Sequence, residues 1–170
     1  MTDEISASRS AEHEAARRDR TFLVVVDDSP ERAVALRYAA LRAARGGGRV
    51  ALLRVTEPPG QTEWAGVEEM MRAERRAEAE QLLQGLAAEV NRITGTMPVL
   101  YLREGEARDE LLRLLGEEKG ISVLVLASST SSEGPGPLIT ALTGRYNRQL
   151  RTPLVIVPGA LSEDELETVT

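Results

Sequence analysis

The chain has 170 residues, a net charge of −6 and an isoelectric point of about 5.0, which suits one domain built around a single core. The negative field repels nucleic acids and anionic membrane surfaces, and no apolar run approaches the roughly 20 residues that cross a bilayer, so we expect neither partner. The absence of cysteine excludes disulfides and thiolate sites, and the polar N-terminus lacks a secretory-signal pattern, which together predict a cytoplasmic protein.

The two ends of the chain read as polar tails. Residues 1–20 mix charges with few bulky apolar side chains, which predicts disorder or a frayed helix. This tail carries the only histidine, His13, and a mobile segment does not hold an imidazole as catalysis requires. We expect one α/β domain over residues 21–158, followed by an acidic C-terminal tail, residues 159–170, without a fixed fold.

Five short apolar runs alternate with helical stretches along the domain, a pattern typical of a parallel α/β sheet. Two of the runs are almost continuously aliphatic, which indicates strands buried on both faces and helices on both sides of the sheet. The expected strands are residues 22–26, 49–55, 99–102, 123–127 and 154–157, and the expected helices are residues 30–45, 67–93, 107–119 and 138–150.

Apolar positions at helical spacing predict which helix faces are buried. In the first helix the expected stripe is Ala33, Leu36, Ala40 and Ala44. In the second, long helix it is Met70, Ala73, Ala77, Leu82, Leu86 and Val90.

The first strand stops abruptly on two carboxylates, Asp27 and Asp28. Unpaired carboxylates avoid a packed interior, so this end must lie at the rim of the sheet, facing water, a cation or a ligand. Ser29 is suited to cap the next helix, Pro30 to its first position, and Glu31 to its positive end. The strand-to-helix turn is therefore a candidate binding site.

A serine- and glycine-rich loop, residues 127–137, follows the fourth strand. In open α/β sheets, ligands gather beyond the carboxyl ends of strands where the connections diverge, so we expect this loop and Asp27 to share one crevice. Hydroxyl groups, a helix start and glycines such as Gly134 suit a phosphate there.

Other residues of the same region oppose phosphate binding. Pro135 and Pro137 donate no backbone hydrogen bond, and Glu133 repels phosphate unless a cation intervenes. Arg145, after the next helical stretch, is a candidate for a forked phosphate contact or for an ordinary surface ion pair.

Four features of the chain occur together in a pattern that is typical of one protein family. They are the run Val-Val-Val-Asp-Asp-Ser at 24–29, Gly105 before a helix, the spacing of Ser131, Gly134 and Gly144, and the run Pro-Leu-Val-Ile-Val-Pro at 153–158. With them, residues 20–158 resemble the universal stress protein family. The resemblance implies an open parallel five-stranded sheet ordered 3-2-1-4-5, a Rossmann-like, adenine nucleotide alpha hydrolase-like fold. It also implies a homodimer through the last strand and, in one branch, ATP or AMP at the carboxyl edge, with Mg²⁺ only beside the nucleotide.

The resemblance also assigns site residues. It places Asp27 beside the ligand and its metal, and the backbone of Val55 against adenine. The ATP-binding branch carries G-x2-G-x9-G-[ST], where this chain reads Ser131, Gly134, Gly144 and Arg145, so two of the four marked positions match. The candidate cofactor-binding residues are Asp27, Asp28, Ser29, Val55, Ser131, Gly134, Gly144 and Arg145, and the candidate metal ligand is Asp27.

Three functions are open at this point. The leading one is a stress-response signalling module in which an adenine nucleotide orders the loop and biases partner contacts. The alternative is a homodimeric scaffold that binds no nucleotide and recruits a client protein, in which the carboxylates only solvate a strand end and the glycines only shape a turn. The third is a slow ATP hydrolase with Mg²⁺ on Asp27 or Asp28, for which the sequence offers no dedicated general base.

Overall fold

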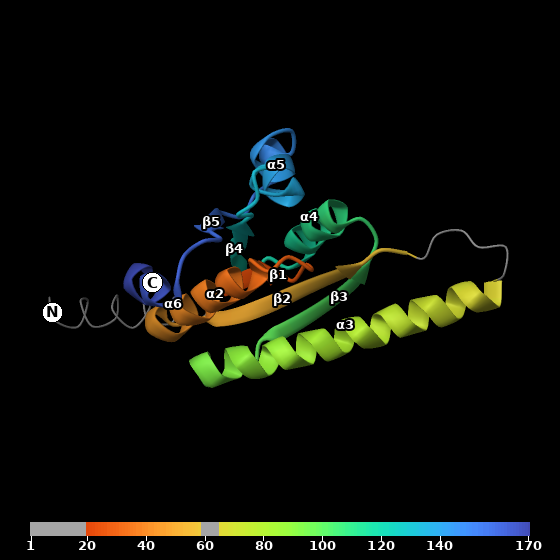
Figure 1. Cartoon of the computed structure of the whole chain (residues 1–170), viewed down its shortest axis with the longest axis horizontal. Coiled ribbons are helices and arrows are strands. Elements are labelled where there is room, and N and C mark those ends of the chain that lie inside the picture. The colour runs from red at the N-terminus through yellow and green to blue at the C-terminus, as the bar shows by residue number, and fades with distance from the viewer. Residues whose placement is uncertain (1–19, 59–64) are drawn as a thin grey trace, which may run out of the picture.

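The five apolar runs pair in parallel into one sheet in the computed structural model, which describes residues 20–58 and 65–170 (Figure 1). The order β3-β2-β1-β4-β5 confirms the expected one. The strands are β1 (Thr21–Val25), β2 (Arg49–Thr56), β3 (Val99–Glu104), β4 (Ile121–Ser128) and β5 (Leu154–Pro158). The helices are α2 (Arg32–Gly46), α3 (Ala65–Thr94), α4 (Ala107–Glu117), α5 (Pro137–Thr143), α6 (Glu163–Val169) and the short 3₁₀ helix η1 (Asn147–Gln149). Of the expected N-terminal tail, residues 1–19, including His13, lie outside the described residues.

Side chains of β1 alternate between two cores, one on each face of the sheet. Phe22 and Val24 pack with α2, α3 and α6, whereas Leu23 and Val25 pack with α4 and α5. Because helices cover both faces, the run 22–25 of this central strand is apolar at every position, as the sequence predicted.

The 30-residue α3 spans about 45 Å, and its buried side chains begin at Ala79, near the middle of the helix. Figure 1 shows its N-terminal half extending beyond the ends of β2 and β3. The expected burial of Met70, Ala73 and Ala77 was therefore wrong, and Met70 is 73% exposed. The buried side chains are Ala79, Leu83, Ala87 and Val90. Among the described helices, none has both the length and the apolar character needed to cross a membrane.

Helix α2 begins at Arg32, two residues later than expected, and Ser29 does not cap it. Its N-cap residue, Glu31, makes no side-chain capping bond within the helix. Ala33 and Ala44 are exposed, which corrects the expected stripe. The helix packs on the sheet and on α3, and it buries Ala35, Leu36, Ala39, Ala40, Leu41 and Ala43.

The expected helix over residues 138–150 is interrupted. Gly144 has φ −98° and ψ −113°, which is not helical, and its N–H closes α5 on the carbonyl of Thr140 at 3.1 Å. The chain then forms η1 before β5. Helical spacing alone did not reveal this break.

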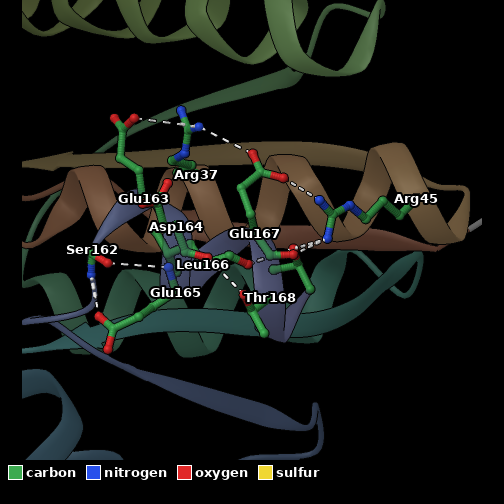
Figure 2. A network of polar contacts seen from close by, with 10 residues as sticks. Arg37, Arg45, Ser162, Glu163, Asp164, Glu165, Leu166, Glu167 and Thr168 are labelled. Atoms are coloured by element: carbon green, nitrogen blue, oxygen red, sulfur yellow. Dashed lines mark hydrogen bonds and ion pairs between the residues drawn. The ribbon is translucent and has the colours of Figure 1, made fainter.

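The acidic C-terminal segment folds, which corrects the expectation that it lacks a fixed structure. It forms α6, which begins with a capping box between Ser162 and Glu165. Leu166 is 2% exposed and packs into the α2 side of the core. Figure 2 shows the ion pairs that join α6 to α2: Arg37 with Glu163 and Glu167, and Arg45 with Glu167. These partners are far apart in the sequence, so composition alone did not indicate them.

Candidate functional site

The carboxyl ends of β1 and β4 meet at one edge of the sheet. β1 pairs in parallel with both β2 and β4, while α2 and α4 cover opposite faces. This is the switch point at which open α/β sheets hold ligands. Asp27 follows β1 and the loop of residues 129–136 follows β4, so the predicted juxtaposition of these two elements is present.

A cavity of about 670 Å³ opens between these two elements, a size within the usual range of small-molecule sites. Part of the lining is apolar and includes Val25, Ala35, Leu126 and Ile139. Of the predicted site residues, Asp27, Ser29, Ser131 and Gly134 line the cavity.

Asp27 is held by the turn that follows it. One carboxylate oxygen, Oδ1, accepts hydrogen bonds from the N–H of Ser29 at 3.0 Å and from its hydroxyl at 2.6 Å. The hydroxyl of Ser29 is thus directed to Asp27 instead of to the helix start. Arg32 donates to the backbone carbonyl of Asp27 at 3.0 Å, which places a guanidinium at the cavity.

A second hollow, of about 570 Å³, adjoins the first because Val25 and Asp27 line both. It contains the predicted residues Asp28 and Val55. Arg54 donates to both carboxylate oxygens of Asp28, at 2.9 and 3.1 Å, and to the carbonyl of Val26 at 3.1 Å. The carboxylate of Asp28 is therefore paired with Arg54 of β2. Because Asp27 lines both hollows, a ligand that spans them would lie next to Asp27.

Most backbone donors of the loop after β4 are already used within the protein. The N–H of Ser129 bonds the carbonyl of Pro135 at 3.0 Å. The N–H of Ser131 bonds the hydroxyl of Ser129 at 3.1 Å, and that of Glu133 bonds the hydroxyl of Ser131 at 3.3 Å. With Pro135 in this loop and Pro137 at the start of α5, few N–H groups remain to cradle a polyphosphate.

Glu31 ties the start of α2 to this loop, a role that the sequence reasoning missed. Its buried carboxylate accepts hydrogen bonds from the N–H and the hydroxyl of Thr130, at 2.8 and 2.7 Å. These bonds lower the pKa of Glu31 below its ordinary value of 4.5. Gly159 packs against the pair, because a Cβ there would lie 2.5 Å from Cγ of Glu31 and 2.1 Å from the carbonyl oxygen of Ser128. The only signal in the sequence was an acidic residue two positions after the Asp-Asp-Ser run.

Gly144 and Arg145 do not line either hollow. Gly144 ends α5, and the exposed Arg145 lies 5.9 Å from the ring centroid of Tyr146. The phosphate-loop spacing in the sequence therefore places only Ser131 and Gly134 at the cavity.

The cavity is acidic and partly apolar. Asp27, Glu31 and Glu133 line it together with a single arginine, Arg32. Within residues 20–58 and 65–170, no group of three or more acidic or histidine side chains is placed to hold a metal ion. Asp27 alone supplies too few ligands for Mg²⁺, which would need phosphate oxygens to complete its coordination. This lining suits a ligand that combines an apolar ring with few phosphate charges.

Comparisons with known proteins bear on the family and the fold of the chain. A family model described as the Universal stress protein family matches residues 19–158. No curated protein matches the chain.

Solved structures share the fold at low identity. The universal stress protein UspA from Lactobacillus plantarum is 15% identical, with 82% of this chain and 98% of that chain covered and a TM-score of 0.69. A universal stress protein in complex with cAMP is 19% identical, with coverage of 83% and 98% and a TM-score of 0.58. The universal stress protein from Archaeoglobus fulgidus in complex with dAMP is also 19% identical, with coverage of 81% and 97% and a TM-score of 0.54.

Proposed function

Because the chain belongs to the universal stress protein family, we propose that it binds an adenine nucleotide of low phosphate charge, AMP or cyclic AMP, at the carboxyl edge of the sheet. The observation that carries the proposal is the cavity of about 670 Å³ between Asp27 and the loop after β4. Two proteins with the same fold were solved with cAMP and dAMP, which supports adenine as the base.

The lining residues favour one phosphate over three. The carboxylates of Asp27 and Glu133 repel each added phosphate charge, and most loop N–H groups are bonded internally. Arg32 supplies one cation, enough to pair with a monophosphate. ATP would bind more weakly and would depend on Mg²⁺, which Asp27 and the phosphate oxygens would hold together.

The bound nucleotide acts by ordering the loop rather than by reacting. Contacts to Ser131 and Gly134 restrict the loop that leads into α5. The surface of this loop therefore differs between the ligand-bound and free states, and a partner protein binds the two states with different affinity. This is a stress-response signalling role that requires no catalysis.

Isothermal titration with AMP, cyclic AMP and ATP, each with and without Mg²⁺, tests the proposal. We expect AMP or cyclic AMP to bind at least about tenfold more tightly than Mg²⁺-free ATP, a difference of about 1.4 kcal/mol. At a ligand concentration about 100-fold above the Kd, binding should also stabilise the fold by about 2.7 kcal/mol in thermal unfolding.

A matched pair of variants locates the site. Ser131 lines the cavity and Ser132 does not, although both are exposed neighbours in the loop. Ser131→Trp should abolish nucleotide binding, and Ser132→Trp should retain it. If no nucleotide binds to the wild-type protein, the nucleotide-free scaffold is the better account.

A further inference from the structure

Glu31 is a buried acid in the lining of the cavity, and none of the ion pairs among the described residues includes it. The other buried acid within residues 20–58 and 65–170, Glu110, pairs with Arg113. The arginine next to Glu31 in the chain, Arg32, donates to the carbonyl of Asp27. A carboxylate that leaves water without a cationic partner needs strong hydrogen-bond donors. The donors around Glu31 therefore decide whether this position tolerates an anion.

Thr130 supplies two such donors. Its N–H and its hydroxyl both donate to one carboxylate oxygen of Glu31, Oε1, at 2.8 and 2.7 Å. The N–H is the main cause of the lowered pKa of Glu31 and the hydroxyl adds to it, so the side chain is an anion at neutral pH. Glu31 is also the N-cap residue of α2, where the positive end of the helix favours negative charge. The loop after β4 and the start of α2 together stabilise an anion, and Glu31 is that anion.

Thr130 is the residue through which the loop after β4 meets this charge. The N–H of Ser129 donates to a backbone carbonyl, and the N–H groups of Ser131 and Glu133 donate to serine hydroxyls. These acceptors are uncharged, whereas Thr130 presents a backbone N–H and a hydroxyl to a carboxylate from another segment. Phosphate oxygens accept the same combination of donors. The carboxylate of Glu31 therefore takes donors that suit a phosphate group.

The side chain of Glu31 is held along its length. Its carboxylate is bonded to Thr130, and its stem packs on Gly159, where a Cβ would lie 2.5 Å from Cγ of Glu31. A phosphate group must break the bonds to Thr130 and displace a packed side chain before it reaches the same donors. Because Glu31 is part of the chain, it competes for them without the loss of translational freedom that accompanies ligand binding.

We propose that Glu31 determines the specificity of the cavity: its carboxylate occupies the donors that a second phosphate group needs, so the site accepts nucleotides with one phosphate and discriminates against di- and triphosphates. This inference rests on the adenine-nucleotide binding proposed above. It adds a second cause to the repulsion by Asp27 and Glu133, because donors that are already bonded reject a further phosphate even where its charge is screened.

Isothermal titration of the full chain with inorganic pyrophosphate tests the proposal without a nucleoside. Glu31→Ala frees both donors of Thr130 and should bind pyrophosphate at least about tenfold more tightly than wild type. Glu31→Gln removes the charge but keeps an oxygen that accepts from Thr130, so its gain should be about threefold or less. Glu133→Gln is the matched control, because it removes another carboxylate of the lining that is not bonded to Thr130, and its gain should also be about threefold or less.

The gain in Glu31→Ala should depend on the side chain at residue 130. Adding Thr130→Val removes the hydroxyl and should reverse at least about threefold of the gain, whereas adding Thr130→Ser keeps the hydroxyl and should preserve it. In titrations with ATP and AMP, the affinity of Glu31→Ala for ATP relative to AMP should rise by about tenfold over wild type. Circular dichroism checks that each variant is folded, and Glu31→Ser replaces Glu31→Ala if the latter does not fold.

Two outcomes overturn the proposal. Equal gains in Glu31→Ala, Glu31→Gln and Glu133→Gln would mean that charge alone selects the ligand. Pyrophosphate affinity in Glu31→Ala and Glu31→Ser that stays at the wild-type level would mean that the donors of Thr130 do not serve a phosphate. Failure of AMP and cyclic AMP to bind the wild-type protein would instead reject the proposed function, while the pyrophosphate titrations still decide whether Glu31 blocks an anion site.

Discussion

Glu31 and Thr130 join two segments that are 99 residues apart: the carboxylate of Glu31 accepts both the N–H and the hydroxyl of Thr130, at 2.8 and 2.7 Å. The pair fixes the start of α2 against the loop after β4. The cavity between them is therefore shaped by a bond between its two sides as well as by the sheet itself.

Glu31→Gln should flatten the acid dependence of stability. The bonds from Thr130 lower the pKa of Glu31 in the folded state below its ordinary value of 4.5. Their stabilisation is therefore present above about pH 4.5 and is lost as the pH falls through the lower, folded value. Urea unfolding at about pH 7 and at successively lower pH should show the wild-type advantage over Glu31→Gln shrinking on acidification. Parallel curves for the two proteins would contradict this role.

Gly159→Ala should destabilise the protein by about 1–3 kcal/mol or more. The added Cβ would lie 2.1 Å from the backbone oxygen of Ser128 and 2.5 Å from Glu31 Cγ. Either the backbone around residue 159 or the bonded pair of Glu31 and Thr130 must therefore shift. Gly85→Ala is the matched control, because a Cβ at this helical glycine meets nothing within 4 Å. It should stabilise α3 by about 0.5–1 kcal/mol. Chemical denaturation of the two variants should give effects of opposite sign.

Burial, more than charge, should hold α6 in place. Leu166→Ala should cost about 2–4 kcal/mol, because Leu166 is 2% exposed within the core. Val169→Ala should have little effect, since Val169 is 55% exposed. Glu167→Gln removes pairs with Arg37 and Arg45 that water partly screens (Figure 2), so it should cost about 1 kcal/mol or less. If unfolding midpoints show that Glu167→Gln destabilises the protein more than Leu166→Ala does, charge and not burial holds α6 in place.

Glu133→Gln should improve ATP binding more than AMP binding. Glu133 lines the cavity and is exposed, so the repulsion that it exerts on phosphates is screened, and we expect a gain of about threefold for ATP. Titration at low and high salt measures this, with the gain shrinking at high salt. A loss of ATP affinity would show that Glu133 assists binding instead.

The two halves of α3 should differ in amide hydrogen exchange. Residues 66–78 include exposed side chains such as Met70, whereas the later part buries Leu83 and Val90 in the core. Local opening needs less free energy where few apolar contacts are broken. Exchange measured by mass spectrometry should be faster for the first half. Uniform protection along α3 would indicate that a partner protein or a second copy of this chain covers its N-terminal half.

The sequence predicted the sheet well because its signals were local and mutually consistent. Continuous aliphatic runs such as that around Val24 identify strands covered on both sides, and glycines and prolines mark where they end. The same reasoning failed for Ala33, Met70 and Ala77, because helical periodicity gives an apolar side but not how far the helix overlaps the sheet. It also placed Gly144 and Arg145 by spacing, whereas the chain turns away from the cavity after α5.

By itself, the sequence determined the alternation of strands and helices, and it indicated that Asp27 lies at the carboxyl edge of the sheet. These features follow from side-chain polarity and turn chemistry within a few residues. Only the tertiary structure decided that Glu31 bonds Thr130 and that α6 folds onto α2. Each of these depends on contacts between segments distant in the chain, whose partners the local sequence does not specify.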